Sequence, residues 1–448
     1  MQSHPLVPFN IQSGWLPNHK RESFQQFFKI IFAADHKELA PSIMALKTMI
    51  EENEVLEYLV TNAFQQNANV VEASQTSSQA PIPAIPSLDV LLHAFNTILT
   101  TPPQFINNDL VGLPFSAIVV GIDATLGGST LFRLPMFNDK MKAILQHWSE
   151  FLVSPASADG FAQENYQWLT ETAKNQYKFP LWKKDSETLP YWKSWDSFFT
   201  REFINPEKER PIAGLDTNQI ICCPNDGSLF CWQPEVKRKD VFWLKDMPYS
   251  LDDIFSSTDA EQDKLIKKHK LSEMFDGGYV FQTYLNPYNF HRWWVPVNGK
   301  VLFDPMVIPG CFFSKLVLPD YGGATTASLP YLAEANARGL MVIETEDYGN
   351  VCCIPLGMSE VSTVEFDKKM KKNAIVKKGE EMGMFHYGGS SFVIIFQNLP
   401  DKHLVFMNDE GKLYPQQPPP AANSSATGEF NTNIGSQIGQ WFCKVESK

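Results

Sequence analysis

The 448-residue sequence lacks features that mark several large classes of protein. Its 38 Lys and Arg residues face 50 Asp and Glu residues, and this net charge of -12 argues against a nucleic-acid binder, which would carry a basic face. No apolar run is long enough to span a membrane, since the longest, residues 111–122, is about half a span. The cysteines form no C-x-x-C motif, and the adjacent pairs Cys222-Cys223 and Cys352-Cys353 would point to opposite faces of a strand. We therefore predict no metal site.

The composition that remains is typical of a large globular protein. Hydrophobic residues make up 44% of the chain, which is enough to bury a sizeable core. The chain does not open with a basic, apolar and small-residue signal. We therefore expect a soluble, cytoplasmic protein, with peripheral contact to a membrane left open, and the sequence gives no indication of its oligomeric state.

Three stretches of different composition predict an α+β protein. Residues 1–165 carry apolar positions at helical spacing and indicate an N-terminal helical domain, with a flexible stretch rich in Ala, Ser, Gln, Asn and Pro near residues 65–86. Residues 166–215 form a Trp-rich connector, whose tryptophans are expected to pack between domains. Residues 216–448 show the short strands and turns of a β-rich core.

Two turns of this β-rich region share one pattern. Pro224-Asn225-Asp226-Gly227 and Pro296-Val297-Asn298-Gly299 each place an Asx-Gly pair after a proline. Such pairs suit tight turns with positive φ angles, so the pattern predicts two β-hairpins.

The most informative segment is Gly388-Gly389-Ser390-Ser391, which leads directly into the apolar run Phe392–Phe396. An ordinary glycine turn before a core strand explains this segment. Alternatively, Ser390 attacks the backbone carbonyl of Gly389, because two glycines allow the close approach and the strain that such an attack needs. A similar tetrad that ends at Ser129 lies in the helical third, before the other motifs.

An attacking serine needs a base, and that base needs an orienting partner. Of the nine histidines, His291 and His386 lie in the turn-rich β-region, and His386 precedes Ser390 by four residues. Asp226, in the first Asx-Gly turn, is a candidate for the orienting group. Each of the three also has an ordinary structural explanation, as a strand histidine, an interior histidine or a turn aspartate.

Taken together and in order, these motifs resemble the phosphatidylserine decarboxylase family over residues 195–441. The motifs are Phe198-Phe199-Thr200-Arg201 with Arg210-Pro211-Ile212, then Pro224-Asn225-Asp226-Gly227, then His291-Arg292 before Pro296-Val297-Asn298-Gly299, and finally Gly383-Met384-Phe385 before Gly388-Gly389-Ser390-Ser391. The helical N-terminal region is similar to the extra domain of a soluble branch that includes fungal tryptophan decarboxylases.

This resemblance implies an activity and a self-made cofactor. The family's proenzyme cuts itself, here between Gly389 and Ser390, and Ser390 becomes a pyruvoyl group. A long chain of residues 1–389 and a short chain of residues 390–448 would remain associated. The pyruvoyl ketone would form a Schiff base with the substrate amine and serve as an electron sink for decarboxylation. The substrate would be phosphatidylserine or a free L-amino acid, including aromatic ones such as tryptophan.

One position departs from the family pattern. The family has His-Arg-x-His where this chain has His291-Arg292-Trp293-Trp294, and it uses the two histidines for self-cleavage and decarboxylation. The indole of Trp294 cannot act as a base, because its nitrogen only donates a hydrogen bond. Three explanations remain open: His291 serves both steps, His386 substitutes, or the protein does not mature and acts as a binding or scaffold protein.

Overall fold

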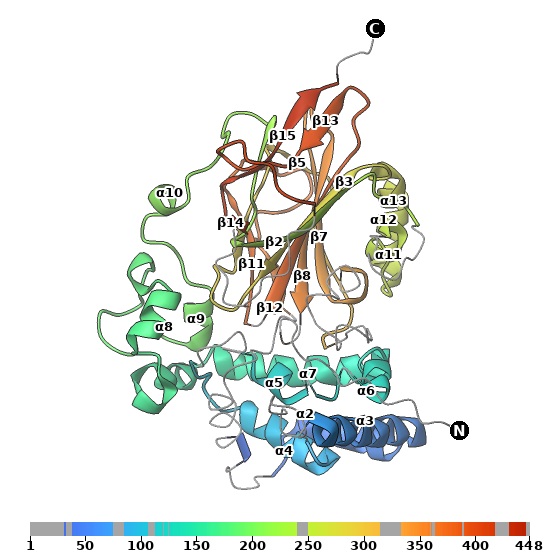
Figure 1. Cartoon of the computed structure of the whole chain (residues 1–448), viewed down its shortest axis with the longest axis vertical. Coiled ribbons are helices and arrows are strands. Elements are labelled where there is room, and N and C mark those ends of the chain that lie inside the picture. Colours follow the sequence, from blue (N-terminus) through green and yellow to red (C-terminus); the bar gives the residue numbers. More distant parts are fainter. Residues whose placement is uncertain are drawn as a thin grey trace.

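The computed structural model describes residues 31–32, 38–74, 85–105, 113–119, 121–123, 125–239, 250–313, 333–358, 360, 363–387, 389–416 and 430–444. It confirms the predicted α+β class, with helices in the first part of the chain and strands from Ile220 onward. In Figure 1 the helices of residues 41–152 form a layer across one end of the strand-rich region. None of the helices in the described ranges is long and apolar enough to cross a membrane.

The helical layer contains the amphipathic segments that the 3.6-residue periodicity predicts. Ser87 caps one helix through its side chain, and prolines occupy the first turn of two others, where the missing N–H has no cost. The helices are α2 (Pro41–Glu51), α3 (Glu54–Ser74), α4 (Leu88–Ile98), α5 (Pro114–Val119), α6 (Leu126–Leu131) and α7 (Pro135–Leu152).

The prediction of a flexible stretch over residues 65–86 was wrong for residues 65–74, which complete α3. Ala and Gln tolerate a helix well, and α3 packs closely on α6. A Cβ atom on Gly127 would lie 2.7 Å from the backbone oxygen of Leu59, so α6 needs glycine at this contact. The tetrad ending at Ser129 therefore serves helix packing, while residues 75–84 lie outside the described residues.

The connector is built around buried aromatic rings. Trp168, Trp192 and Trp195 surround Phe198 with ring centroids 4.6–5.4 Å apart. Trp195 also contacts Tyr387 of the β-region, which confirms the predicted packing of the connector tryptophans between parts of the chain. Two short helical segments precede the connector, η1 (Pro155–Ala162) and η2 (Glu164–Tyr166), and it contains α8 (Glu171–Gln176), η3 (Phe179–Leu181), α9 (Trp195–Phe199) and α10 (Pro206–Glu209).

A nine-stranded antiparallel sheet dominates the β-region, in the order β10-β5-β7-β8-β12-β3-β2-β14 with β6 beside β7. Its strands are β2 (Gly227–Pro234), β3 (Tyr279–Leu285), β5 (Gly299–Val301), β6 (Met306–Ile308), β7 (Arg338–Glu344), β8 (Asn350–Met358), β10 (Ile375–Val376), β12 (Gly389–Phe396) and β14 (Asn431–Thr432). Three short helices follow β2: α11 (Leu251–Ile254), α12 (Ala260–His269) and α13 (Leu271–Met274).

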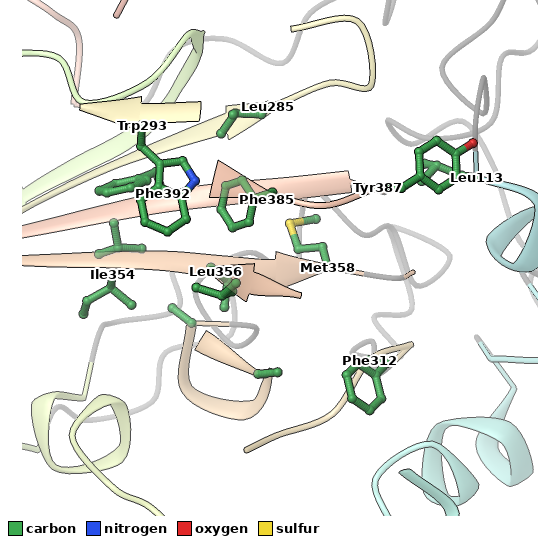
Figure 2. Close-up of a cluster of buried hydrophobic side chains, with 14 of the residues drawn as sticks. Leu113, Leu285, Trp293, Phe312, Ile354, Leu356, Met358, Phe385, Tyr387 and Phe392 are labelled. Carbon is green, nitrogen blue, oxygen red and sulfur yellow. The ribbon is translucent and has the colours of Figure 1, made fainter. Parts of the chain in front are cut away.

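Two three-stranded sheets complete the β-region, in the orders β1-β15-β13 and β4-β11-β9. Their strands are β1 (Ile220–Cys222), β4 (Arg292–Trp294), β9 (Val364–Phe366), β11 (Glu381–Phe385), β13 (Lys402–Val405) and β15 (Gln437–Cys443). The ring of Trp293 lies 5.3 Å from Phe385 and 6.0 Å from Phe392, so the β4-β11-β9 sheet packs on β12. Figure 2 shows these rings in one buried cluster that extends to Tyr387.

The prediction of two β-hairpins at the Asx-Gly turns was wrong. The turn at Asp226 leads from β1, which pairs with β15, to β2, which pairs with β3 and β14. The turn at Asn298 leads from β4, which pairs with β11, to β5, which pairs with β7 and β10. Local turn chemistry reversed the chain as expected, but partners distant in sequence decide the pairing. Each turn consequently lies where two sheets meet.

Candidate active site

Ser390 lies at the start of β12, in the middle of the large sheet. It is opposite Leu285 of β3 and Gly357 of β8, and its side chain is fully buried. Its hydroxyl has no hydrogen-bond partner in the described structure. The next hydroxyl differs, because Ser391 Oγ donates to the Thr283 carbonyl at 2.7 Å and accepts from Gln282 at 2.9 Å. A buried, unpaired hydroxyl costs about 1–3 kcal/mol, so Ser390 calls for a functional explanation.

His291 is also fully buried, and neither of its ring nitrogens makes a hydrogen bond of normal geometry in the described residues. Its ring stacks on Phe199 at 4.1 Å, and its backbone oxygen accepts from Phe385 at 2.9 Å, beside the strand that leads to the tetrad. Burial and then the positive charge of Arg201 hold the pKa of His291 well below its usual value, and the nearby Asn289 backbone offsets this only in part. His291 is therefore a neutral imidazole that can accept a proton but donates one poorly.

Arg201 fixes the loop in front of His291. Its guanidinium donates to the backbone oxygens of Tyr288 and Asn289 at 2.9 and 3.0 Å and lies 4.5 Å from the ring centre of Trp182. Burial lowers the pKa of Arg201 to about 10, so it remains a cation near neutral pH. Sequence reasoning included this arginine in a motif but missed its position against His291.

Asp226 is bound to groups other than His291. Both carboxylate oxygens accept from Arg210, at 3.0 and 2.7 Å, and one also accepts from the backbone N–H of Ile434 at 2.8 Å. The described structure has no hydrogen bond between Asp226 and His291. The Asp226 turn instead meets β4 at Trp294, whose backbone N–H donates to the Pro224 carbonyl at 2.8 Å. The position that differs from the family pattern is thus the one next to Asp226.

His386 lies between two carboxylates. Its Nδ1 is 2.8 Å from Asp196 of α9, and its Nε2 is 3.1 Å from Glu365 of β9. Burial by itself would lower the pKa of His386, but hydrogen bonds and charges from Asp196 and Glu365 outweigh it and raise the pKa. With both ring nitrogens engaged in this way, His386 favours its protonated form and has little capacity to act as a base.

Tyr387, the residue after His386, packs in the core. Tyr387 is buried, its ring centre lies 5.2 Å from Phe199 and 4.7 Å from Trp148 of α7, and its hydroxyl has no hydrogen-bond partner in the described structure. Phe199 therefore contacts both His291 and Tyr387. The helical layer, through Trp148, thus forms part of the wall at the tetrad end of β12.

Sequence reasoning also missed Glu360, which follows β8. Glu360 is 2% exposed and accepts hydrogen bonds from the backbone N–H and from the hydroxyl of Ser116. An acidic residue two positions after a continuous apolar strand was a signal that could have drawn attention to it. No group of three or more His, Cys, Asp or Glu side chains suited to a metal ion occurs in the described ranges.

Comparisons with known proteins identify the family. Residues 195–414 match a family model described as phosphatidylserine decarboxylase, and residues 40–177 match a second model of the same description. A decarboxylase from Amanita muscaria, iboD, is 35% identical over 66% of this chain and 87% of its own length. The chain belongs to the phosphatidylserine decarboxylase family. It is a decarboxylase of that family.

Other relatives in the family differ in how much of the chain they share. An L-tryptophan decarboxylase from Psilocybe cyanescens is 29% identical over 63% of this chain and 67% of its own length. A phosphatidylserine decarboxylase proenzyme from Fusobacterium nucleatum is 27% identical over 49% of this chain and 66% of its own length. The fungal relatives thus share more of this chain than the bacterial one does.

Proposed function

We propose that the chain is a proenzyme that cleaves itself between Gly389 and Ser390 and then decarboxylates a free L-amino acid. The observation that carries the proposal is the buried, unpaired hydroxyl of Ser390 at the start of the central strand, directly after the glycines. The hydroxyl of Ser391, the next residue along the strand, is by contrast fully paired. Relatives named as proenzymes support the same conclusion.

Self-cleavage would use groups of this chain alone. Ser390 Oγ attacks the carbonyl carbon of Gly389, the peptide bond is exchanged for an ester, and elimination then separates the two chains, which leaves the Gly389 carboxylate and a dehydroalanine at position 390. Water would hydrolyse the imine tautomer of that dehydroalanine to the pyruvoyl group and release ammonia. The hydroxyl proton needs an acceptor, and neutral His291 has the protonation state for that task. Arg201 supports it in two ways, by fixing the preceding loop and by keeping the imidazole uncharged.

Ser390 fits the role of pyruvoyl precursor, because its hydroxyl is unpaired and its residue would become the first of the short chain. A pyruvoyl carbonyl supplies an electron sink for the bond between a substrate's α-carbon and its carboxylate. Phe199 and Tyr387, which pack on each other beside His291, are buried and keep water from this end of the sheet. A carboxylate held among apolar groups is poorly solvated, which favours its loss as carbon dioxide.

The enclosure of this region favours a free amino acid over a lipid. Ser390 and His291 are completely buried, and the helical layer contributes Trp148 and Ser116 to the same end of the sheet. A small amino acid can be enclosed there, whereas a phospholipid headgroup must remain joined to its acyl chains at a membrane surface. The fungal relatives named as decarboxylases align with more of this chain than the bacterial proenzyme does, and one is named for L-tryptophan.

The first test is the covalent state of the purified protein. Intact mass and a denaturing gel should show two chains that divide at Ser390, with a blocked N-terminus on the shorter one. Ser390→Ala should remain a single, inactive chain, whereas Ser129→Ala, in the helical tetrad, should still be cut. A full-length wild-type chain that stays intact for days would refute the proposal.

The second test concerns the substrate. Release of carbon dioxide should be measured with L-tryptophan, with other free L-amino acids and with phosphatidylserine vesicles. We expect turnover of at least one free amino acid and none of the vesicles. Turnover of the vesicles alone would assign the lipid as substrate, and it would contradict the argument from burial.

A specific observation supports a second candidate, a family member that does not mature and acts as a binding or scaffold protein. Trp294 lies at the Asp226 turn, and Asp226 is fully engaged by Arg210 and Ile434. This arrangement leaves the turn without a titratable base at position 294. A permanently uncut wild-type chain with no turnover of any of the substrates above would favour this candidate.

A further inference from the structure

Glu360 is a buried carboxyl group with no cationic partner in the described structure. It is 2% exposed, and its two oxygens accept from the backbone N–H of Ser116 at 2.6 Å and from the Ser116 hydroxyl at 2.8 Å. Burial raises the pKa of Glu360 to about 7, while the two bonds from Ser116 act in the opposite direction. Near neutral pH the group therefore exchanges between its protonated and ionised forms.

The strand pairing places Glu360 at the tetrad. Gly357 lies opposite Ser390 and Met358 opposite Gly389, so the chain reaches Glu360 three residues beyond the partner of Ser390. Strand β8 ends at Met358, so Glu360 follows two residues after the partner of Gly389. Packing supports the same placement, because the ring of Trp148 contacts both Phe115, next to Ser116, and Tyr387, three residues before Ser390.

The contact with Ser116 suits a carboxyl group that gains and loses a proton. The Ser116 hydroxyl donates to a carboxylate, and by rotating it can accept from a carboxylic acid. Both protonation states therefore keep a partner in a buried site. The residue comes from α5, so the helical layer supplies this support across 244 positions of sequence.

We propose that Glu360, held by Ser116 of the helical layer, is the proton donor of the decarboxylation. This inference rests on the proposed function above. The bond between the substrate's α-carbon and its carboxylate breaks and carbon dioxide leaves. The electron pair of that bond then takes the proton of Glu360 to form a new C–H bond. Water returns a proton to Glu360 after the product leaves. Neutral His291 is a poor donor, so the reaction needs such an acid.

The first experiment reads the protonation of Glu360 without turnover. Infrared spectra of Ser390→Ala and of Ser390→Ala with Glu360→Gln are compared between pH 5 and pH 9. We expect the difference to contain the carbonyl band of a protonated carboxylic acid that disappears as the pH rises through about 7. Glu334, whose pKa burial also raises to about 7, is present in both proteins and cancels. A difference spectrum without that band overturns the proposal.

The second experiment separates catalysis from maturation. Glu360→Gln should still be cut at Ser390, as intact mass shows, but should lose roughly 10²–10⁴-fold in turnover. Glu334→Gln, the matched control, should stay within a few-fold of wild type. A cut Glu360→Gln protein with turnover close to wild type overturns the proposal, whereas an uncut wild-type protein overturns the proposed function instead.

The third readout is the pH profile, which a purely structural role would not move. Turnover should fall at alkaline pH as Glu360 ionises. Ser116→Ala removes a hydrogen bond that stabilises the ionised form and so raises the pKa of Glu360. The alkaline limb of the pH profile of this variant should therefore shift to higher pH. Tyr387 is the titratable group that faces Glu360 in the described structure, and burial keeps it neutral across this range. If the alkaline limb of the pH profile is unchanged in a folded, cut Ser116→Ala protein, the assignment of Glu360 as the proton donor is contradicted.

Discussion

At the scale of single residues, the site depends on buried groups that differ in how well they are compensated. Asp226 is paired with Arg210 on both oxygens, His386 has two carboxylates, and Ser390 and His291 have no hydrogen-bond partner in the described structure. The paired charges matter for stability, because deleting one partner leaves the other as an isolated charge in a medium of low dielectric constant. Uncompensated groups are the ones available for chemistry.

The ion pair between Arg210 and Asp226 should be important for stability. Their side chains are 11% and 8% exposed, so Arg210→Met would leave a buried carboxylate with only the Ile434 N–H as a strong partner. We expect a loss of about 3–5 kcal/mol in the free energy of unfolding by urea. Lys183→Met, which removes a pair with the exposed Glu202, should cost about 1 kcal/mol or less. Equal losses in both variants would contradict this account.

Position 294 should control the rate of self-cleavage. Trp294→His would place an imidazole next to the Asp226 turn, where the backbone N–H of residue 294 contacts Pro224. We expect faster conversion of the full-length chain to two chains, followed by intact mass after synthesis in a cell-free system. Trp293→His is the contrasting variant, since that ring lies in the apolar core and should lose folding rather than gain cleavage. No change of rate in folded Trp294→His would show that the position has no part in cleavage.

At the scale of elements, the end of β11 is tied to α9 by the contact of His386, the residue after the strand, with Asp196. The bond between them holds α9, which carries Phe199 against His291. A histidine with a raised pKa contributes stability that is fully present below its unfolded value and is lost as the pH rises through the folded value.

The contribution of His386 should therefore depend on pH with a definite sign. The difference in unfolding free energy between wild type and His386→Gln should be largest below about pH 6.5, the usual value for histidine, and should shrink at higher pH. Urea unfolding at a series of pH values measures it, and His403→Gln on the exposed side of β13 provides the control. If the difference in unfolding free energy grows with pH instead, the contacts of His386 do not favour its protonated form.

Periodicity and turn chemistry predicted the elements better than their partners. The apolar stripes of α2, α4 and α7 and the apolar run of β12 could be read directly, because local burial patterns determine them. The contacts of Asp226 with Arg210 and of Glu360 with Ser116 could not be predicted, because no local pattern links residues that are distant in sequence. Ser116 and Glu360, for example, are 244 positions apart. The Asx-Gly turns failed as hairpins for the same reason: their strands have partners elsewhere.

At the scale of the whole molecule, the helical layer and the β-region share one continuous apolar core. Trp148 of α7 contacts Phe115 within the layer and Tyr387 at the tetrad. Asn138 of the same helix accepts from the backbone N–H of Phe312. The layer is therefore a structural part of the site, and damage to it should reach the chemistry.

Trp148→Ala should test this coupling. The side chain is 2% exposed, and we expect its removal to cost about 3–5 kcal/mol and to slow cleavage at Ser390, because Tyr387 loses one wall of its packing. Unfolding is followed by circular dichroism and cleavage by intact mass. Tyr58→Ala, at a position 66% exposed, should change neither. Normal cleavage in a destabilised Trp148→Ala protein would separate the layer from the site.

Because β12 lies in the middle of the large sheet, a cut at Ser390 would have to follow folding of the whole chain. Residues 390–396 are hydrogen-bonded to β8 on one edge and to β3 on the other, and β15, later in the same segment, pairs with β1. After a cut at Ser390 the short chain would still be interleaved with the long one. It could leave only by opening ladders on both edges of its strand at once. The uncut chain folds as one piece, but the separated pieces would have to reinsert a central strand, so each molecule would be assembled only once.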